Sequence, residues 1–175
     1  MTAAGITVRT LADVTPGQVD ELADVLLDCV AGGASVSFMH PLPRERALAF
    51  WRSVADGVAR GERALVVAEE AGRIVGTAQL VLAQPDNQPH RADLAKMLVH
   101  RGARRRGTGE ALVREAERAA RASGKTLLVL DTASPDAKRL YERAGWVACG
   151  TVPDYALLPQ GGYCDTTFYY RRLAS

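Results

Sequence analysis

The chain has 175 residues, of which 47% are hydrophobic and 24% are charged, and this composition is typical of one globular domain spanning 1–175. A formal net charge of +2 argues against a nucleic-acid partner, and the absence of a signal-peptide pattern and of about 18 consecutive apolar residues predicts a cytoplasmic protein with no membrane partner. Cys29, Cys149 and Cys164 lie far apart, without the spacing of metal ligands, so we expect neither a metal site nor a disulfide framework.

The N-terminal third predicts one strand and two helices. Residues 6–11 are expected to form the strand, and Thr15-Pro16 has the residue types of a helix N-cap and a first helical position. Apolar residues recur at helical spacing as far as Val30, and Gly32-Gly33 then ends the helix. After an irregular segment, residues 44–60 predict a second helix with one apolar face.

The next elements are all predicted strands. Residues 63–69 and 73–82 are expected to form a hairpin around a turn that contains Gly72. A loop rich in Pro, Asn and Gln follows at 83–90, and 91–100 predicts a fourth strand. This part of the chain therefore predicts an antiparallel half-sheet.

The last part of the chain predicts a parallel crossover and a C-terminal pair of strands. The amphipathic helix after Gly109 leads to a buried-type strand at 126–132, which favours a βαβ unit. Strands at 146–152 and 166–173 are expected to be linked by an irregular, glycine-rich segment at 153–165. We therefore expect an α+β fold, with a mixed and mostly antiparallel sheet of about seven strands flanked by about four helices.

The most informative motif is Arg104-Arg105-Arg106-Gly107-Thr108-Gly109, between the fourth strand and the helix that follows it. Glycines allow close approach of the backbone to a ligand, a helix N-terminus offers unpaired N–H groups, and arginines add positive charge. The motif therefore predicts a pyrophosphate-binding loop. It is not a P-loop, because Glu110 follows Gly109, and Leu112 stands where a dinucleotide fingerprint needs a third glycine. A solvated basic turn is the alternative interpretation.

This loop resembles the acetyl-CoA pyrophosphate loop of the GNAT superfamily of N-acetyltransferases, whose pattern is Arg-x-x-Gly-x-Gly/Ala. The segment Ser134–Trp146 is similar to a second landmark of the family, in which the family's tyrosine is Tyr141. More narrowly, Gly32–Met39 and Gly150–Ala156 resemble the tabtoxin-resistance type, which detoxifies a β-lactam antibiotic. The resemblance implies the same fold as the predicted elements.

The resemblance also implies how acetyl-CoA binds. The fourth and fifth strands would diverge, so that the pantetheine arm pairs with the backbone of the fourth strand and the pyrophosphate rests on the loop, where Arg104 and Arg106 add charge-assisted bonds. The implied cofactor-binding residues are Leu98, Val99, His100, Arg104, Arg105, Arg106, Gly107, Thr108, Gly109 and Glu110.

Three residues are candidates for acid–base chemistry. Tyr141 is the candidate acid that protonates the departing thiolate, although its place on the apolar face of its helix equally suits a core residue. Asp93 and Asp131 are alternative bases. Asp93 stands fourteen residues before Gly107, the separation of the glutamate base in some relatives. Asp131 ends the fifth strand, and its alternative role is to cap the turn that follows. Deprotonation of the amine by solvent is a third alternative.

The acceptor is expected to contact Ser35, Phe38 and Tyr155, which offer a polar and aromatic lining. The predicted function is acetyl-CoA-dependent N-acetylation of a small-molecule amine, with an antibiotic or an amino-acid-like toxin as the narrower expectation, by a monomer or homodimer. Two alternatives remain open: a protein or peptide N-acetyltransferase, and an acyl-CoA-binding module without turnover.

Overall fold

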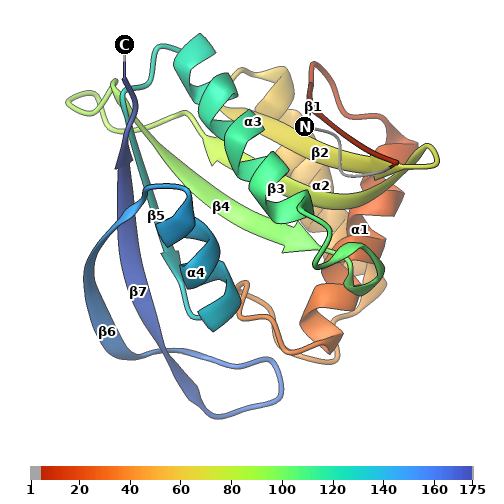
Figure 1. Cartoon of the computed structure of the whole chain (residues 1–175). Helices are drawn as coiled ribbons and strands as arrows, with labels where there is room; N and C mark the ends of the chain where they lie inside the picture. The colour runs from red at the N-terminus through yellow and green to blue at the C-terminus, as the bar shows by residue number, and fades with distance from the viewer. Residues whose placement is uncertain (1–4, 175) are drawn as a thin grey trace.

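A seven-stranded sheet forms the centre of the structure, a computed structural model that describes residues 5–174 (Figure 1). All neighbouring strands pair antiparallel except β4 and β5, which are parallel. In sheet order the strands are β1 (Ile6–Leu11), β2 (Arg63–Glu70), β3 (Arg73–Val81), β4 (Arg91–Val99), β5 (Leu127–Thr132), β7 (Tyr163–Arg172) and β6 (Val147–Leu157). The expected α+β fold with a mostly antiparallel sheet is confirmed.

The helices cover both faces of the sheet and create two hydrophobic cores (Figure 1). One face carries α1 (Pro16–Ala31) and α2 (Arg44–Ala59), and the other carries α3 (Thr108–Ala122) and α4 (Pro135–Arg143). A short 3₁₀ turn, η1 (Arg101–Ala103), joins β4 to the glycine loop. None of the described helices is long and apolar enough to span a bilayer.

The first helix shows how directly the local sequence specifies an element. The Thr15 hydroxyl accepts a hydrogen bond from the Gln18 N–H at 3.2 Å, and the Gln18 side chain accepts one from the Thr15 N–H at 2.9 Å. This capping box and Pro16 satisfy or remove donors that a helix N-terminus leaves unpaired. The buried residues that follow, which include Val19, Leu22 and Leu26, place α1 against the sheet.

The C-terminal hairpin differs from the sequence prediction. The segment 153–165 was expected to be irregular, but β6 continues to Leu157 and β7 begins at Tyr163. The register between β6 and β7 is irregular between Val152 and Ala156, where Asp154 has a φ of 52°. A bulged edge strand tolerates Pro153 and a positive φ, so residues that are typical of a break here lie inside a strand.

Strand β4 contains a bulge that reverses which face its side chains point to. Its register with β3 shifts by one residue between Ala95 and Leu98, and Lys96 lies there with a φ of 51°. As a result Leu94 belongs to the core beneath α3, whereas Leu98 belongs to the core beneath α1 and α2.

Strands β4 and β5 open away from each other. They pair only at their first residues, Arg91–Asp93 with Leu127–Val129, and Figure 1 shows them diverging beyond that point. From Leu94 onwards the backbone of β4 has no ladder partner on its β5 side among the described strands. The divergence implied by the family resemblance is therefore present.

Candidate active site

A cavity of about 910 Å³ lies where β4 and β5 diverge. Its walls come from the segment between α1 and α2, the N-terminus of α3, one side of α4, and strands β4 to β7. The residues predicted from the sequence that line it are Ser35, Leu98, Val99, Arg104, Arg105, Gly107, Thr108, Gly109, Glu110, Asp131, Tyr141 and Tyr155. Those that do not line it are Phe38, Asp93, His100 and Arg106.

The N-terminus of α3 presents unpaired backbone donors to this cavity. Ala111 makes the first helical hydrogen bond, to the Gly107 carbonyl at 3.1 Å, so the N–H groups of Thr108, Gly109 and Glu110 have no acceptor within residues 5–174. Gly107, the N-cap, has a φ of 78°. Such a turn at the positive end of a helix dipole is suited to an anion.

The two glycines of the loop meet different requirements. Gly107 lies in open space but needs the left-handed conformation, which disfavours side chains with a Cβ. At Gly109 a Cβ would lie 3.0 Å from the Cδ2 atom of Leu140, so this glycine also permits the contact between α3 and α4. The contact with Leu140 is therefore a reason for glycine at position 109 that does not depend on a ligand.

The arginines are arranged differently from the sequence expectation. Arg104 Nε donates to the Val99 carbonyl at 2.9 Å, and Arg106 forms an ion pair with Glu70 at 2.5 Å. Both guanidinium groups therefore have protein acceptors. Arg104 and Arg105 line the cavity, and Arg106 does not. The positive charge of the motif therefore ties the loop to β4 and β2 as well as lining the cavity.

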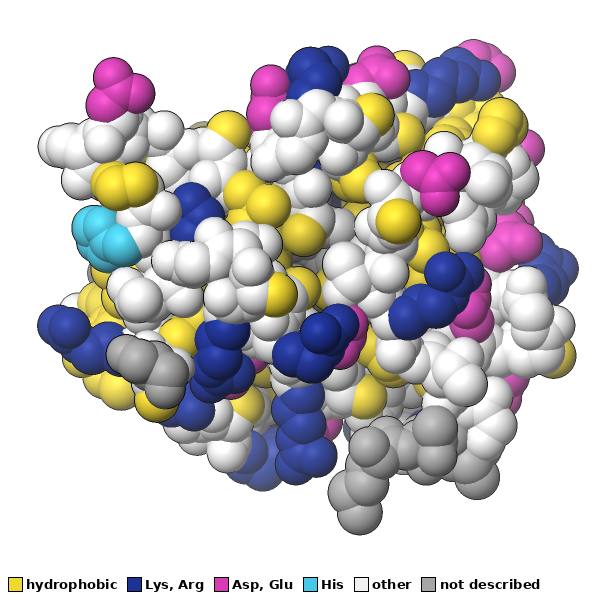
Figure 2. Space-filling view, turned by 90° about the horizontal axis from the view of Figure 1, so that it is seen from above, with side chains coloured by type: hydrophobic (Ala, Val, Ile, Leu, Met, Phe, Trp, Pro, Cys, Tyr) yellow, Lys and Arg dark blue, Asp and Glu magenta, His cyan; other side chains and the backbone are white. Residues whose placement is uncertain are grey.

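Beyond the loop, basic side chains on the molecular surface are interspersed with acidic ones. On the face seen in Figure 2, many Lys and Arg side chains lie in the lower left and centre, whereas most Asp and Glu side chains lie towards the top and right, beside further basic ones. Along α3 the exposed arginines Arg114 and Arg118 are paired with Glu110 and Glu115. The arginine content of the sequence therefore includes many local ion pairs.

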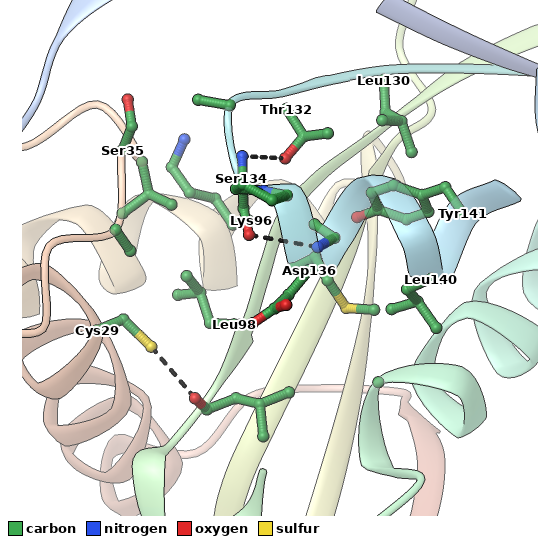
Figure 3. A pocket seen from close by; sticks show the side chains of 18 of the residues that line it. Cys29, Ser35, Lys96, Leu98, Leu130, Thr132, Ser134, Asp136, Leu140 and Tyr141 are labelled. Atoms are coloured by element: carbon green, nitrogen blue, oxygen red, sulfur yellow. Dashed lines mark hydrogen bonds between the residues drawn. The ribbon is translucent and has the colours of Figure 1, made fainter. Parts of the chain in front are cut away.

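The end of β4 is held by groups from α1 and η1. The Cys29 thiol donates to the Val99 carbonyl at 3.5 Å (Figure 3), and burial raises the pKa of this thiol. His100 lies outside the cavity, and its Nδ1 accepts a hydrogen bond from the Gly102 N–H at 3.1 Å. His100 thus shapes the turn into η1 instead of lining the cavity.

Tyr141 joins the core and the cavity. Its side chain is only 3% exposed, and its ring lies 5.6 Å from Trp146 and 6.1 Å from Tyr169 between centroids. Its hydroxyl has no hydrogen-bond partner in the described chain and points into the cavity (Figure 3). Burial raises the pKa of the phenol far above its usual value near 10, so the hydroxyl stays protonated and can donate a hydrogen bond.

Of the two candidate bases, the structure brings only Asp131 to the cavity. Asp131 follows Leu130 on β5, and because Leu130 packs beneath α3 and α4, the Asp131 side chain lies on the opposite face of the sheet. Its carboxylate accepts a hydrogen bond from Thr166 Oγ1 at 2.7 Å. Tyr141 and Asp131 therefore approach the opening between β4 and β5 from opposite sides.

Asp93 lies away from the cavity, which corrects the expectation based on its distance from Gly107. It sits on the paired part of β4, opposite Val129. Its carboxylate forms an ion pair with Arg91 and accepts a hydrogen bond from Gln84 Nε2 at 3.3 Å. Counting residues placed Asp93 too close to the site because it took no account of where β4 leaves β5.

The predicted acceptor residues are divided between the cavity and the core. Ser35 lines the cavity and accepts a hydrogen bond from the Cys164 thiol at 3.6 Å, and Tyr155 lines it with 51% of its surface exposed. Phe38 instead packs edge-on against Phe50, with ring centroids 5.4 Å apart. Phe38 therefore supports the segment between α1 and α2 without reaching the cavity.

Among the cavity residues that the sequence prediction missed, two carry polar groups next to Asp131 or the segment with Ser35. Thr166 was assigned only to a strand, and nothing in its neighbours indicates that it donates to Asp131. Lys96 interrupts the apolar run of β4 and lines the cavity. A lysine inside a strand of otherwise apolar residues is unusual, and this signal was available in the sequence.

Comparison with known proteins agrees with this geometry. A family model described as the acetyltransferase (GNAT) family matches residues 28–146. The chain is 34% identical, over 128 residues, to an uncharacterized N-acetyltransferase from the hisH-hisA intergenic region of Azospirillum brasilense, a match that covers 72% of this chain and 74% of that protein.

Solved structures with a similar fold include enzymes with acetyl-CoA bound. A phosphinothricin acetyltransferase from Sinorhizobium meliloti, solved with AcCoA, has a TM-score of 0.78 at 20% identity, covering 97% of this chain and 89% of its own. A putative acetyltransferase from Salmonella typhimurium, solved with acetyl-CoA, has the same TM-score and identity and covers 98% and 95%. A ribosomal-protein-alanine N-acetyltransferase from Brucella melitensis has a TM-score of 0.79 at 22% identity, covering 95% and 99%.

The family match covers more than half of the chain and includes β4, the glycine loop, α3 and α4. The opening between β4 and β5 lies within the matched range, and so do most residues that line the cavity; the lining residues of the C-terminal hairpin lie beyond it. The chain belongs to the acetyltransferase (GNAT) family.

Proposed function

We propose that this protein transfers an acetyl group from acetyl-CoA to the amine of a small molecule. The observation that carries the proposal is the position of the cavity. It opens where the parallel pair β4 and β5 separates, with backbone donors of α3 at one end and the Asp131 carboxylate at the other. Acetyl-CoA and the acceptor amine can therefore meet from opposite faces of the sheet.

Acetyl-CoA would be bound mainly by backbone groups. The N–H groups of Thr108, Gly109 and Glu110 provide a site for the pyrophosphate, and Arg105 adds positive charge beside it. The unpaired edge of β4, around Leu98, suits an extended amide-containing arm that pairs as an additional strand. Acetyl-CoA supplies an activated acetyl thioester, and the chain's own residues perform the remaining tasks.

Tyr141 and Asp131 have complementary tasks in this proposal. Asp131 accepts the proton of the acceptor amine, directly or through water, while Thr166 holds its carboxylate in place. The Tyr141 hydroxyl donates a hydrogen bond to the negative charge that develops on the leaving sulfur. Because its pKa is raised, it stabilises this charge by hydrogen bonding more readily than by complete proton transfer.

The narrower part of the proposal is an amino-acid-like acceptor, such as an antibiotic of that chemistry. Support comes from the resemblance of Gly32–Met39 to the tabtoxin-resistance type, and Ser35 from this segment lines the cavity. Phosphinothricin acetyltransferases are also among the proteins with a similar fold. The cavity lining includes the polar side chains of Ser35, Lys96 and Asp131, which suit a small polar acceptor.

The test is release of free CoA thiol from acetyl-CoA by the purified full chain across a panel of amines. The panel contains amino acids, their amides, polyamines, amino-acid-like antibiotics and short peptides, and mass spectrometry identifies each N-acetyl product. Amine-dependent thiol release with at least one small molecule is the expected result.

Two outcomes would favour the alternatives. Turnover restricted to peptides would favour a peptide or protein N-acetyltransferase. Saturable acetyl-CoA binding without thiol release on any amine would favour a binding module. A Gly107→Val variant, which is expected not to bind acetyl-CoA, serves as the matched control for binding.

A further inference from the structure

Lys96 is a charged residue in an otherwise apolar part of β4, at the bulge. Its side chain is half-buried, lines the cavity and extends towards the segment that carries Ser35 (Figure 3). Its Nζ atom donates to Ser37 Oγ at 3.1 Å and lies 5.7 Å from the centroid of the Phe50 ring. Within residues 5–174 its ammonium group forms no ion pair with a carboxylate.

The groups around Lys96 leave its charge incompletely compensated. Burial is the largest influence and lowers the pKa of Lys96, and the Arg63 guanidinium lowers it further. The Asp131 carboxylate raises the pKa of Lys96, although the two groups form no ion pair within residues 5–174. A half-buried ammonium without a carboxylate partner is unfavourable unless a ligand supplies the anion.

Lys96 and Asp131 also have the right relative placement for one ligand. They come from adjacent strands at the point where these strands separate, and both line the same cavity. One side of the cavity therefore carries a cation and another an anion. A small molecule with an ammonium and a carboxylate can satisfy both, whereas a simple amine can satisfy only Asp131.

We propose that Lys96 is a specificity-determining residue that pairs with the carboxylate of the acceptor, so that the preferred acceptors are free amino acids or close analogues of them. The acceptor amine then lies towards Asp131. Ser37, already bonded to Lys96, keeps the ammonium directed into the cavity. This inference rests on the proposed acetyl transfer to a small amine and adds the group that selects among amines.

The experiment compares matched acceptors that differ in one charge. Each amino acid that supports thiol release is paired with its amide, which keeps the amine and side chain but replaces the carboxylate by a neutral group. Wild type is expected to prefer the acid within each pair. Lys96→Met is expected to lower kcat/KM for the acid by about 10- to 100-fold, mainly through KM, and to leave the amide within about twofold.

Two further variants complete the design. Lys96→Arg keeps the charge and should retain the preference for the acid, even if the absolute rate falls. Lys138→Met removes a lysine of α4 that does not line the cavity, and it should change neither member of a pair. For every variant, the increase in melting temperature on addition of acetyl-CoA shows that the fold and the acetyl-CoA site are intact.

The outcomes separate this inference from the proposed function. An equal loss for acid and amide in Lys96→Met would assign Lys96 to support of the α1–α2 segment and overturn the inference. Wild-type turnover that favours the amide would also overturn it. Absence of thiol release with every amine, despite acetyl-CoA binding, would overturn the proposed function and this inference together.

Discussion

The hydroxyl of Tyr141 and its ring occupy different environments, and this separates the two interpretations of the residue. The ring packs with Trp146 and Tyr169 in the core, while the hydroxyl faces the cavity without a partner in the described chain. A residue needed only for packing has no use for that hydroxyl. The removal of one oxygen atom therefore tests the catalytic role with little effect on the core.

Tyr141→Phe is expected to lower kcat by about 10²- to 10⁴-fold, because the hydrogen bond to the leaving sulfur is lost. The melting temperature and acetyl-CoA affinity should remain near those of wild type, since the ring stays in place and the missing hydroxyl bonds nothing in the described chain. Steady-state kinetics under conditions where chemistry is rate-limiting provide the measurement. A variant within about twofold of wild type would assign Tyr141 to the core alone.

Asp131→Asn removes the proposed base and keeps the shape of the side chain, so that Thr166 can still donate to its oxygen. We expect kcat/KM to fall by about 10²- to 10⁴-fold at neutral pH. The difference in kcat/KM between wild type and Asp131→Asn should become smaller as the pH approaches the pKa of the acceptor amine, because the amine then loses its proton to solvent. Asp93→Asn is the matched control, and an equal deficit in that variant would contradict the assignment of Asp131.

At the scale of elements, the glycine loop connects β4 to α3 and also fixes how α3 meets α4. Gly107 is required by its left-handed backbone, whereas Gly109 is required by contact with Leu140. The two positions therefore predict different responses to the smallest side chain.

Gly107→Ala is expected to weaken acetyl-CoA binding about tenfold, because strain in the turn displaces the backbone donors, with a cost of about 1 kcal/mol to stability. Gly109→Ala is expected to affect stability through Leu140 as well, and shortening that side chain in a Gly109→Ala/Leu140→Ala double variant should restore acetyl-CoA binding relative to Gly109→Ala. Calorimetric titration with acetyl-CoA is the measurement. Failure of the second change to restore any affinity would show that Gly109 serves ligand approach alone.

Helix α1 and the 3₁₀ turn η1 are joined by the contact between Asp28 and Arg101, and the strength of this contact depends on pH. Burial by itself would raise the pKa of Asp28, but the Arg101 N–H, at 2.9 Å, and the Arg101 Nε, at 2.8 Å, together outweigh it and lower that pKa below its usual 3.8. A carboxyl group with a lowered folded-state pKa stabilises the fold above its unfolded-state pKa. This stability is lost as the pH falls through the lower folded-state value.

Asp28→Asn is therefore expected to reduce the free energy of unfolding by about 1 to 2 kcal/mol at neutral pH and by less below about pH 3.8. Denaturant unfolding at a series of pH values measures the difference. Asp86→Asn, in the exposed loop after β3, is the control and should show neither effect. If the free energy of unfolding of Asp28→Asn were lower than that of wild type by the same amount down to low pH, the ion-pair explanation would be contradicted.

At the scale of the whole molecule, the opening between β4 and β5 divides the sheet into a part with β1 to β4 and a part with β5 to β7. The described strands of the two parts are paired with each other only at the start of β4 and β5. Acetyl-CoA bound in the opening would therefore add contacts between the two parts. Binding to the folded state alone raises its stability by mass action.

Acetyl-CoA at about 100 times its dissociation constant is expected to stabilise the fold by about 2.7 kcal/mol and raise the melting temperature by about 5 to 10 °C. Differential scanning fluorimetry across a concentration series is the measurement. Gly107→Val should show no shift. No shift in wild type at millimolar acetyl-CoA would contradict a donor site in the opening.

Local signals in the sequence determined much of this protein. Capping residues, glycines and hydrophobic periodicity located the first three helices and most strands, because these properties act over a few residues. The glycine loop and Tyr141 were identified by pattern, and both line the cavity. The C-terminal hairpin was underestimated because Pro153 and Asp154 are typical of loops, whereas pairing with β7 keeps this edge in strand conformation.

Only the tertiary structure decided which charged residues face the cavity. Asp93 and Asp131 had equal claims in the sequence, but β4 and β5 separate after Asp93, so only Asp131 reaches the opening. The bulge at Lys96 shifts the alternation of side chains along β4, and Arg104 turns to the Val99 carbonyl instead of outward. Strand register, bulges and competition between acceptors depend on contacts between residues far apart in the chain, and no local pattern contains them.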